Sequence, residues 1–309
     1  MSKLNSNLNK AKKEKNDEFY TLLSDIEKEL KYYKEQFEGK TVYCNCDDPI
    51  ESNFWVYFDM NFDLLKLKAL VSTSYNTEKQ AIKFELKRDE NGKRIGPFKT
   101  LIGGNGDFRS KESIEILKQS DIVVTNPPFS LFREFIAQLV EYNKKFLIIG
   151  NFNAVNNVEI FPLIKENKLY LGYSPISGMD FMIPDGSIKK IKAVWFTNLE
   201  VNKRNEELVL FEKYYDYYDK ESGKLKPYKE NKYPKFDGFD AINVNKVSDI
   251  PMDYEGIMGV PVTFLDKHNP NQFEIVGIAN NAKPGNNYIL AKPIINNKNI
   301  YARIFIRRK

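Results

Sequence analysis

Residues 126–129, with the sequence Asn-Pro-Pro-Phe, have the types and spacing to bind a planar amine. They follow an apolar run over 122–125 and precede a segment over 130–142 whose apolar residues recur at helical spacing. We therefore expect them at the C-terminal end of a buried strand, where open α/β sheets bind ligands. Because proline fixes φ and keeps the preceding residue extended, the Asn126 side chain and the Pro127 carbonyl form two fixed hydrogen-bond acceptors for one amino group.

Pro128 and Phe129 complete this tetrapeptide. Pro128 stiffens the turn, and Phe129 offers an aromatic face on which a planar ring can stack. Two acceptors beside an aromatic face suit the exocyclic amine of a flipped base. The alternative is a plain Pro-Pro turn with a phenylalanine in the core. The strand before the turn and the helix after it favour the functional interpretation.

The composition of the chain limits the classes of protein and of binding site that need to be considered. The 309 residues suffice for one large domain or two ordinary ones, and 47 basic against 42 acidic residues give a net charge of +5, which allows a basic face without proving one. Cys44 and Cys46, the only two cysteines, lie in one strand-loop segment, so no disulfide framework is possible beyond that local pair, and we expect no disulfide. With His268 as the only histidine, we expect no metal. The polar residues 1–15 predict a flexible basic tail rather than a signal peptide, and a cytoplasmic protein.

Apolar runs alternate with helical patterns along the first two thirds of the chain, which predicts an α/β fold with a mostly parallel sheet. A capping box at Ser24 and Glu27 and an N-cap at Asp48 are expected to begin helices. After about residue 200, short apolar runs over 273–278 and 300–306 predict a second, α+β part. The expected strands are 41–44, 69–75, 122–125, 146–150, 169–173 and 193–197, with a glycine-rich hairpin or loop over 87–106.

The tetrapeptide resembles the (D/N/S)PP(Y/F) signature of amino-methyltransferases that use S-adenosylmethionine, and the whole chain resembles the EcoRI-type adenine-specific DNA methyltransferases. The resemblance implies a Rossmann-like class I methyltransferase sheet over 16–200, and a smaller α+β target-recognition region over 201–309. It also implies methyl transfer to N6 of an adenine flipped out of double-stranded DNA. The matching stretches run in order through 17–21, 42–49, 52–55, 126–129, 259–265 and the basic C-terminal end.

The same resemblance implies where S-adenosylmethionine binds. The turn after the first strand lacks the usual glycines, and within it Asp47 is the expected partner of the cofactor's ammonium group. Ser74 stands where an acid normally holds the ribose, while Asp107 and Phe108 match the adenine-binding position. The full expected set is Tyr20, Thr21, Asn45, Cys46, Asp47, Asp48, Ser74, Asp107 and Phe108.

The region after residue 200 is expected to contact double-stranded DNA. A solvated basic surface is the alternative for each residue singled out there. Methylation of RNA or of a protein glutamine shares the Asn-Pro-Pro-aromatic signature, and a catalytically silent DNA-binding module is a further alternative. A monomer is favoured, and the sequence leaves the presence of a cognate restriction endonuclease open. The expected DNA contacts are Tyr233, Lys235, Arg303, Arg307 and Arg308.

Overall fold

The computed structural model describes residues 20–75, 80–183, 185–281 and 287–309. The tail predicted over 1–15 and the matching residues 17–19 lie outside these ranges. The chain divides into two compact units: unit 1 comprises Met1–Ala154 and Tyr170–Glu200, and unit 2 comprises Val155–Leu169 and Val201–Lys309. The sequence pattern gave no indication that residues 155–169 belong to unit 2.

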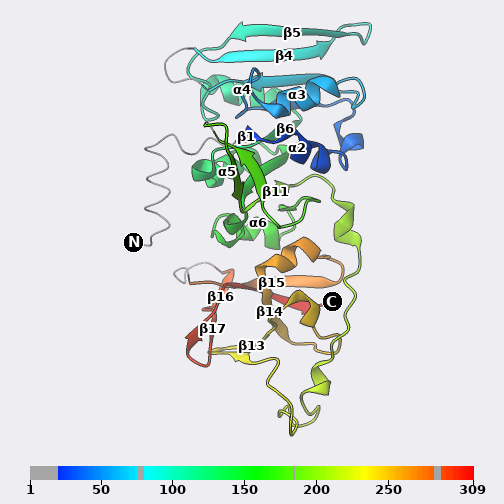
Figure 1. The fold of residues 1–309 in the computed structure, drawn as a ribbon, viewed down its shortest axis with the longest axis vertical. Coiled ribbons are helices and arrows are strands. Elements are labelled where there is room, and N and C mark those ends of the chain that lie inside the picture. The colour runs from blue at the N-terminus through cyan, green and yellow to red at the C-terminus, as the bar shows by residue number, and fades with distance from the viewer. Residues whose placement is uncertain (1–19, 76–79, 184, 282–286) are drawn as a thin grey trace. The chain divides into compact units, whose positions relative to one another are not determined.

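Unit 1 contains a mixed eight-stranded sheet in the order β5-β4-β3-β2-β6-β7-β11-β8, and a small sheet in the order β1-β9-β10 (Figure 1). Its helices are α2 (Leu23–Leu30), α3 (Asn53–Met60), α4 (Lys111–Gln119) and α5 (Phe132–Glu141). Its strands are β1 (Tyr20–Thr21), β2 (Thr41–Cys44), β3 (Ala69–Thr73), β4 (Ile82–Arg88), β5 (Arg94–Leu101), β6 (Ile122–Thr125), β7 (Lys145–Asn151), β8 (Tyr170–Leu171), β9 (Met179–Met182), β10 (Ile188–Ile191) and β11 (Ala193–Thr197).

The centre of the large sheet carries the site. Strand β2 pairs in parallel with β3 on one side and with β6 on the other, and β6 pairs in parallel with β7. These strands are buried along nearly their whole length, because both faces of a parallel sheet are covered. The strands predicted at 41–44, 122–125 and 193–197 are confirmed, as is a helix after the tetrapeptide. Four antiparallel pairings at the two edges make the sheet less parallel than predicted.

Two predicted helix caps are wrong. Helix α2 begins at Leu23, so Ser24 lies inside it and caps nothing. Helix α3 begins at Asn53, and its N-cap is Ser52, whose hydroxyl accepts a hydrogen bond from the Phe54 amide. Asp48 instead closes a separate turn, in which its carboxylate accepts from the Ile50 amide at 2.8 Å. The helix starts only after that turn, which explains the displaced cap.

Unit 2 is mainly β-structure. Its six-stranded sheet has the order β12-β13-β14-β19-β15-β16, and β17 pairs with β18. The run predicted over 273–278 is confirmed as β15, whereas only the last four residues of the run over 300–306 lie in a strand, β19, which pairs with β15. The elements are α6 (Phe161–Lys165), β12 (Lys235–Phe236), β13 (Phe239–Asn243), β14 (Ile257–Pro261), β15 (Phe273–Ala279), β16 (Ile289–Ala291), β17 (Ile294–Ile295), β18 (Lys298–Asn299) and β19 (Arg303–Arg308).

Two features are absent from the residues that the structure describes. Among the helices that the structure describes, none combines the length and apolar character needed to cross a bilayer. Within those same ranges, no group of three or more His, Cys, Asp or Glu side chains is arranged to hold a metal ion.

Candidate active site and cofactor site

The turn after β2 and the Asn-Pro-Pro-Phe turn after β6 lie next to each other in unit 1. Because β2 and β6 are parallel neighbours, with Val42 opposite Ile122, their C-terminal ends meet at one edge of the sheet. The two turns are tied together by hydrogen bonds: the Cys46 amide donates to the Thr125 hydroxyl at 3.2 Å. The sheet thus brings the predicted cofactor turn to the predicted catalytic turn.

Asp47 is the centre of this connection. One carboxylate oxygen accepts from the Ser52 hydroxyl at 2.9 Å, and the other accepts from the Thr125 hydroxyl and from the Asn126 amide, the latter at 3.4 Å. Its main-chain carbonyl accepts from the Ser72 hydroxyl on β3. Asp47 therefore joins β2, β3, α3 and β6 at one point.

Burial governs the charge of this carboxyl. Taking Asp47 out of water raises its pKa to about 6, although the hydrogen bonds from Thr125, Ser52 and the Asn126 amide act in the opposite direction. Because both oxygens already have partners inside the protein, the geometry gives Asp47 a role in holding the Asn126 turn. It gives less support to Asp47 as the partner of an ammonium group.

Two buried polar atoms near this turn have no hydrogen-bond partner among the described residues. They are the Asn45 amide oxygen and the Thr21 hydroxyl, on residues that are 2% and 4% exposed. A buried acceptor left unsatisfied costs roughly 1–3 kcal/mol, so such atoms mark places where a ligand supplies the missing donor. Both belong to the residues expected to bind S-adenosylmethionine, and this fits a polar cofactor.

Strand β1 is held against the segment that follows the cofactor turn. The Asn53 side chain donates to the Thr21 carbonyl at 2.8 Å, and the Tyr20 hydroxyl lies 3.5 Å from the Glu51 carboxylate. Thr21 is also paired with Phe181 of β9. The Phe181 ring meets Phe129 edge to face, with 6.2 Å between the ring centroids. Phe129 therefore has an aromatic neighbour from a segment to which the sequence pattern drew no attention.

The predicted ribose and adenine residues are also neighbours. A β-carbon at Gly106 would collide with the Ser74 carbonyl oxygen, so only glycine permits this close approach, and its φ is +76°. The approach brings the loop before Asp107 against the end of β3. The Ser74 hydroxyl is already used, since it accepts from the Ile82 amide at 2.9 Å.

Asp107 and Phe108 have partners that the sequence did not indicate. The Arg109 guanidinium donates to both oxygens of Asp107, at 2.9 and 2.7 Å, and these bonds lower the pKa of that carboxyl. Phe108 is buried, and its ring packs edge to face on Phe135 of α5 at 5.1 Å. The structure thus makes Phe108 a core residue rather than a free stacking face, because α5 covers it.

The expected DNA contacts in unit 2 differ in accessibility. Tyr233 is 2% exposed and its hydroxyl donates to the Asp249 carbonyl, so it is a core residue and is not presented to DNA. The Arg303 guanidinium donates to Asn243 and is partly buried. Lys235 is exposed but pairs with Asp240 at 2.8 Å. Arg307 and Arg308 are exposed at the end of β19.

Comparison with known proteins decides the family. The family model described as "Adenine-specific methyltransferase EcoRI" matches residues 7–309. This chain belongs to the EcoRI family of adenine-specific methyltransferases. It is 47% identical to the Type II methyltransferase M.EcoRI of Escherichia coli, over 88% of this chain and 89% of that protein. It is also 44% identical to M.MgeORF184P of Mycoplasma genitalium, over 87% of this chain and 84% of that protein. No solved structure gives a significant match.

Membership of the EcoRI family implies S-adenosylmethionine as the cofactor and DNA as the substrate. Sequence reasoning overlooked several residues of the site, whose roles depend on which side chains the fold brings into contact. They are Ser52, Ser72, Arg109, Thr125 and Phe181. The small hydroxyl residues at the strand ends were the only available signal for two of them, Ser72 and Thr125.

Proposed function

We propose that this chain methylates N6 of a flipped adenine in duplex DNA, with Asn126 and the Pro127 carbonyl holding the amino group. The observation that carries the proposal is the link from Asp47 to the Asn126 amide and the Thr125 hydroxyl. It fixes the amine-binding turn beside the turn whose Asn45 side-chain oxygen has no donor among the described residues. The proposed amine-binding site at 126–129 and the proposed cofactor site at 45–48 are thereby held at the same edge of one sheet.

The strand order supports a Rossmann-like class I methyltransferase arrangement. From β2 the chain continues to β3 on one side and returns through β6 on the other side. The order therefore reverses between β2 and β6, and ligands of open α/β sheets bind outside the strand ends at such a switch point. Both the 45–48 turn and the 126–129 turn lie at that position. Residues 16–200 are accordingly the catalytic domain of this proposal.

S-adenosylmethionine supplies a methyl group bound to a positively charged sulfur. An aromatic amine is a poor nucleophile because its lone pair is delocalised into the ring. The Asn126 side-chain oxygen and the Pro127 carbonyl accept hydrogen bonds from the amine and so favour a tetrahedral nitrogen with a localised lone pair. Phe129, supported from the side by Phe181, stacks on the flipped base and orients it. No strong base is needed, since the proton leaves after transfer.

Two of the cofactor contacts are assigned to buried polar atoms that have no hydrogen-bond partner among the described residues. Asn45 and Thr21 accept from donors of S-adenosylmethionine, with Tyr20, Cys46 and Asp48 around them. Asp107 contacts the adenine amino group of the cofactor while Arg109 keeps its carboxylate ionised. Ser74 is adjacent, and its hydroxyl retains a free lone pair for the ribose.

Residues 201–309 form the target-recognition region of this proposal, with exposed Arg307 and Arg308 as phosphate contacts. Relatives of this chain are designated Type II methyltransferases, which supports a role in a restriction–modification system beside a cognate endonuclease. The family match favours DNA over RNA or a protein glutamine as the substrate. Every residue assigned to the proposed site belongs to this one chain, which supports action as a monomer, and a DNA substrate supports a location in the cytoplasm.

The test is Asn126→Ala. Tritiated methyl transfer to DNA should be abolished, while calorimetry should find S-adenosylmethionine binding within a few-fold of the parent protein, because Asn126 addresses the substrate amine. Asn205→Ala, an exposed asparagine of unit 2, is the control and should behave as the parent. Substantial methyl transfer by Asn126→Ala would refute the mechanism.

A further inference from the structure

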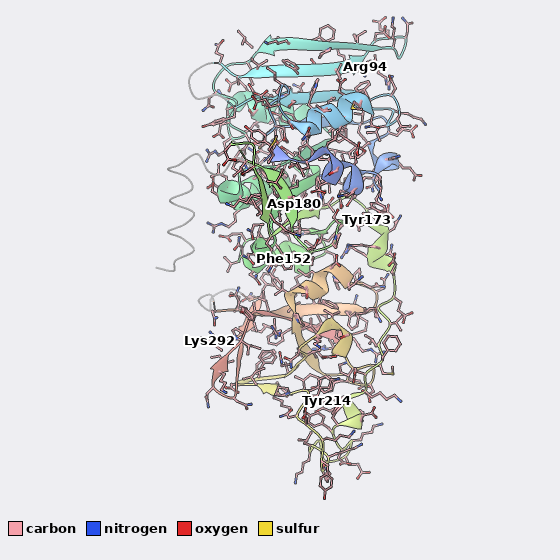
Figure 2. All side chains as sticks on the ribbon, viewed as in Figure 1. Arg94, Phe152, Tyr173, Asp180, Tyr214 and Lys292 are labelled. Carbon is pink, nitrogen blue, oxygen red and sulfur yellow. The ribbon has the colours of Figure 1, made fainter. Side chains whose placement is uncertain are left out.

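Unit 2 contains a segment, residues 214–233, in which tyrosines form a packed base. The rings of Tyr214 and Tyr218 are stacked with 4.4 Å between centroids, and Tyr214 also contacts Tyr233 and Tyr254 at 5.7 and 4.6 Å. In Figure 1 the segment is the yellow-green loop that projects from unit 2 beyond β13, and Figure 2 labels Tyr214 at its base. We call this segment the tyrosine loop.

Hydrogen bonds brace the tyrosine loop from within. Tyr218 forms a β-bridge with Leu225, and its hydroxyl donates to the Asn231 side chain at 2.6 Å. The Lys226 ammonium donates to the Tyr215 carbonyl, also at 2.6 Å. Such bracing lowers the conformational entropy that a binding partner would have to remove.

Within the tyrosine loop, Tyr228 is a fully exposed residue. Its φ is +63°, a left-handed conformation that a large side chain rarely adopts. Strained residues of this kind persist where the surrounding structure holds them, and they concentrate at ligand contacts. A fully exposed aromatic ring on a braced loop is a binding feature rather than a packing feature.

The segment around Tyr228 carries a net positive charge. Residues 219–235 contain six lysines and three acids, whereas the whole chain carries only +5 over 309 residues. Three of the lysines have internal acceptors, namely Lys226, Lys232 and Lys235. The other three are Lys220, Lys224 and Lys229, and all are exposed; Lys220 and Lys229 lie over the rings of Tyr215 and Tyr217 at 5.7 and 5.4 Å.

We propose that the tyrosine loop is a DNA-contacting surface, in which Lys220, Lys224 and Lys229 bind phosphates and Tyr228 enters a groove to contact bases. Duplex DNA is the partner that matches a concentrated positive charge beside an exposed aromatic ring. The inference rests on the DNA-modifying function proposed above and names a surface for it. In this proposal the tyrosine that contacts DNA is Tyr228, and not the buried Tyr233 that the sequence suggested.

The experiment measures binding of the full-length protein to fluorescent duplexes by anisotropy over a series of salt concentrations. The cognate duplex is chosen by modified-base sequencing of DNA from cells that express the protein, and a scrambled duplex is the comparison. One variant is Tyr228→Ala, with Tyr301→Ala as its matched control because Tyr301 is 89% exposed in the same unit. The other replaces Lys220, Lys224 and Lys229 by Ala; its control replaces the exposed Lys246, Lys267 and Lys298.

Tyr228→Ala should lower the ratio of cognate to scrambled affinity about fivefold or more, since a lost base contact reduces discrimination. The lysine variant should weaken binding to both duplexes and flatten the plot of log affinity against log salt by about 0.9 for each lost phosphate contact. If either variant matches its control, the assignment is overturned. Calorimetric binding of S-adenosylmethionine should be unchanged in both variants. Absence of DNA methylation by the parent protein would instead overturn the proposed function.

Discussion

Replacing Asp47 by Asn separates a positioning role from a cofactor-binding role. The substitution conserves shape and removes the charge. One amide oxygen can still accept from the Thr125 hydroxyl and the Asn126 amide, as the Asp47 carboxylate does. The amide nitrogen then faces Ser52, whose hydroxyl donates to Asp47 in the parent protein and loses this acceptor.

The structure sets the expected stability change. Burial raises the pKa of Asp47 to about 6, from 3.8, and a shift of that size corresponds to about 3 kcal/mol. Because the pKa of Asp47 is higher in the folded than in the unfolded protein, this carboxyl contributes its full stabilisation of the fold below about pH 4. The contribution is lost as the pH rises through about 6. The lost Ser52 hydrogen bond costs about 1 kcal/mol at every pH. Asp47→Asn should therefore be slightly less stable than the parent near pH 4 and at least as stable above pH 7.

Catalysis should change in the opposite direction. Hydrogen bonds to an ionised acceptor are roughly twice as strong as neutral ones, so the Asn126 turn loses about 1 kcal/mol of restraint. We expect the maximal rate of methyl transfer at pH 8 to fall about fivefold, while the Kd for S-adenosylmethionine changes less than twofold. The assays are urea unfolding from pH 4 to 8, methyl transfer at saturating cofactor, and calorimetry. Asp63→Asn, which removes the same charge from an exposed aspartate of unit 1, is the control.

Two results would refute this reasoning. A Kd for S-adenosylmethionine raised tenfold or more, with an unchanged maximal rate, would identify Asp47 as the ammonium ligand instead. A stability difference between Asp47→Asn and the parent that stays constant from pH 4 to 7 would mean that Asp47 does not titrate in this window.

Two further predictions concern the cofactor and the DNA. Asn45→Leu removes the buried amide oxygen that has no partner among the described residues, so the cofactor-free variant should melt no lower than the parent. S-adenosylmethionine should, however, raise the melting temperature of the variant far less than that of the parent. An undiminished cofactor-induced shift would exclude Asn45 as a contact. Replacing Arg307 and Arg308 together by Ala should weaken binding to all duplexes alike and reduce the slope of log affinity against log salt by up to about 0.9 per lost contact. If specificity instead relaxes at one base pair and the slope is unchanged, the two arginines contact bases.

The sequence by itself determined the central elements and the family. The apolar runs at 41–44 and 122–125 are correctly predicted to be strands, because a strand covered on both faces needs apolar residues along its whole length. The Asn-Pro-Pro-Phe turn was recognisable because its prolines limit the backbone locally. The same local rules failed at Asp48, where a separate turn precedes the helix and moves the cap to Ser52.

Only the tertiary structure decided which side chains meet. Asp47 and Thr125 are 78 positions apart, and their hydrogen bond exists because β2 and β6 are adjacent in the sheet. Strand order of this kind follows from long-range packing, which local periodicity does not encode. The same reason buried Phe108 under α5 and Tyr233 within unit 2, although their residue types suit binding. A side chain's type indicates what it can contact, and the packing around it decides whether a ligand can reach it.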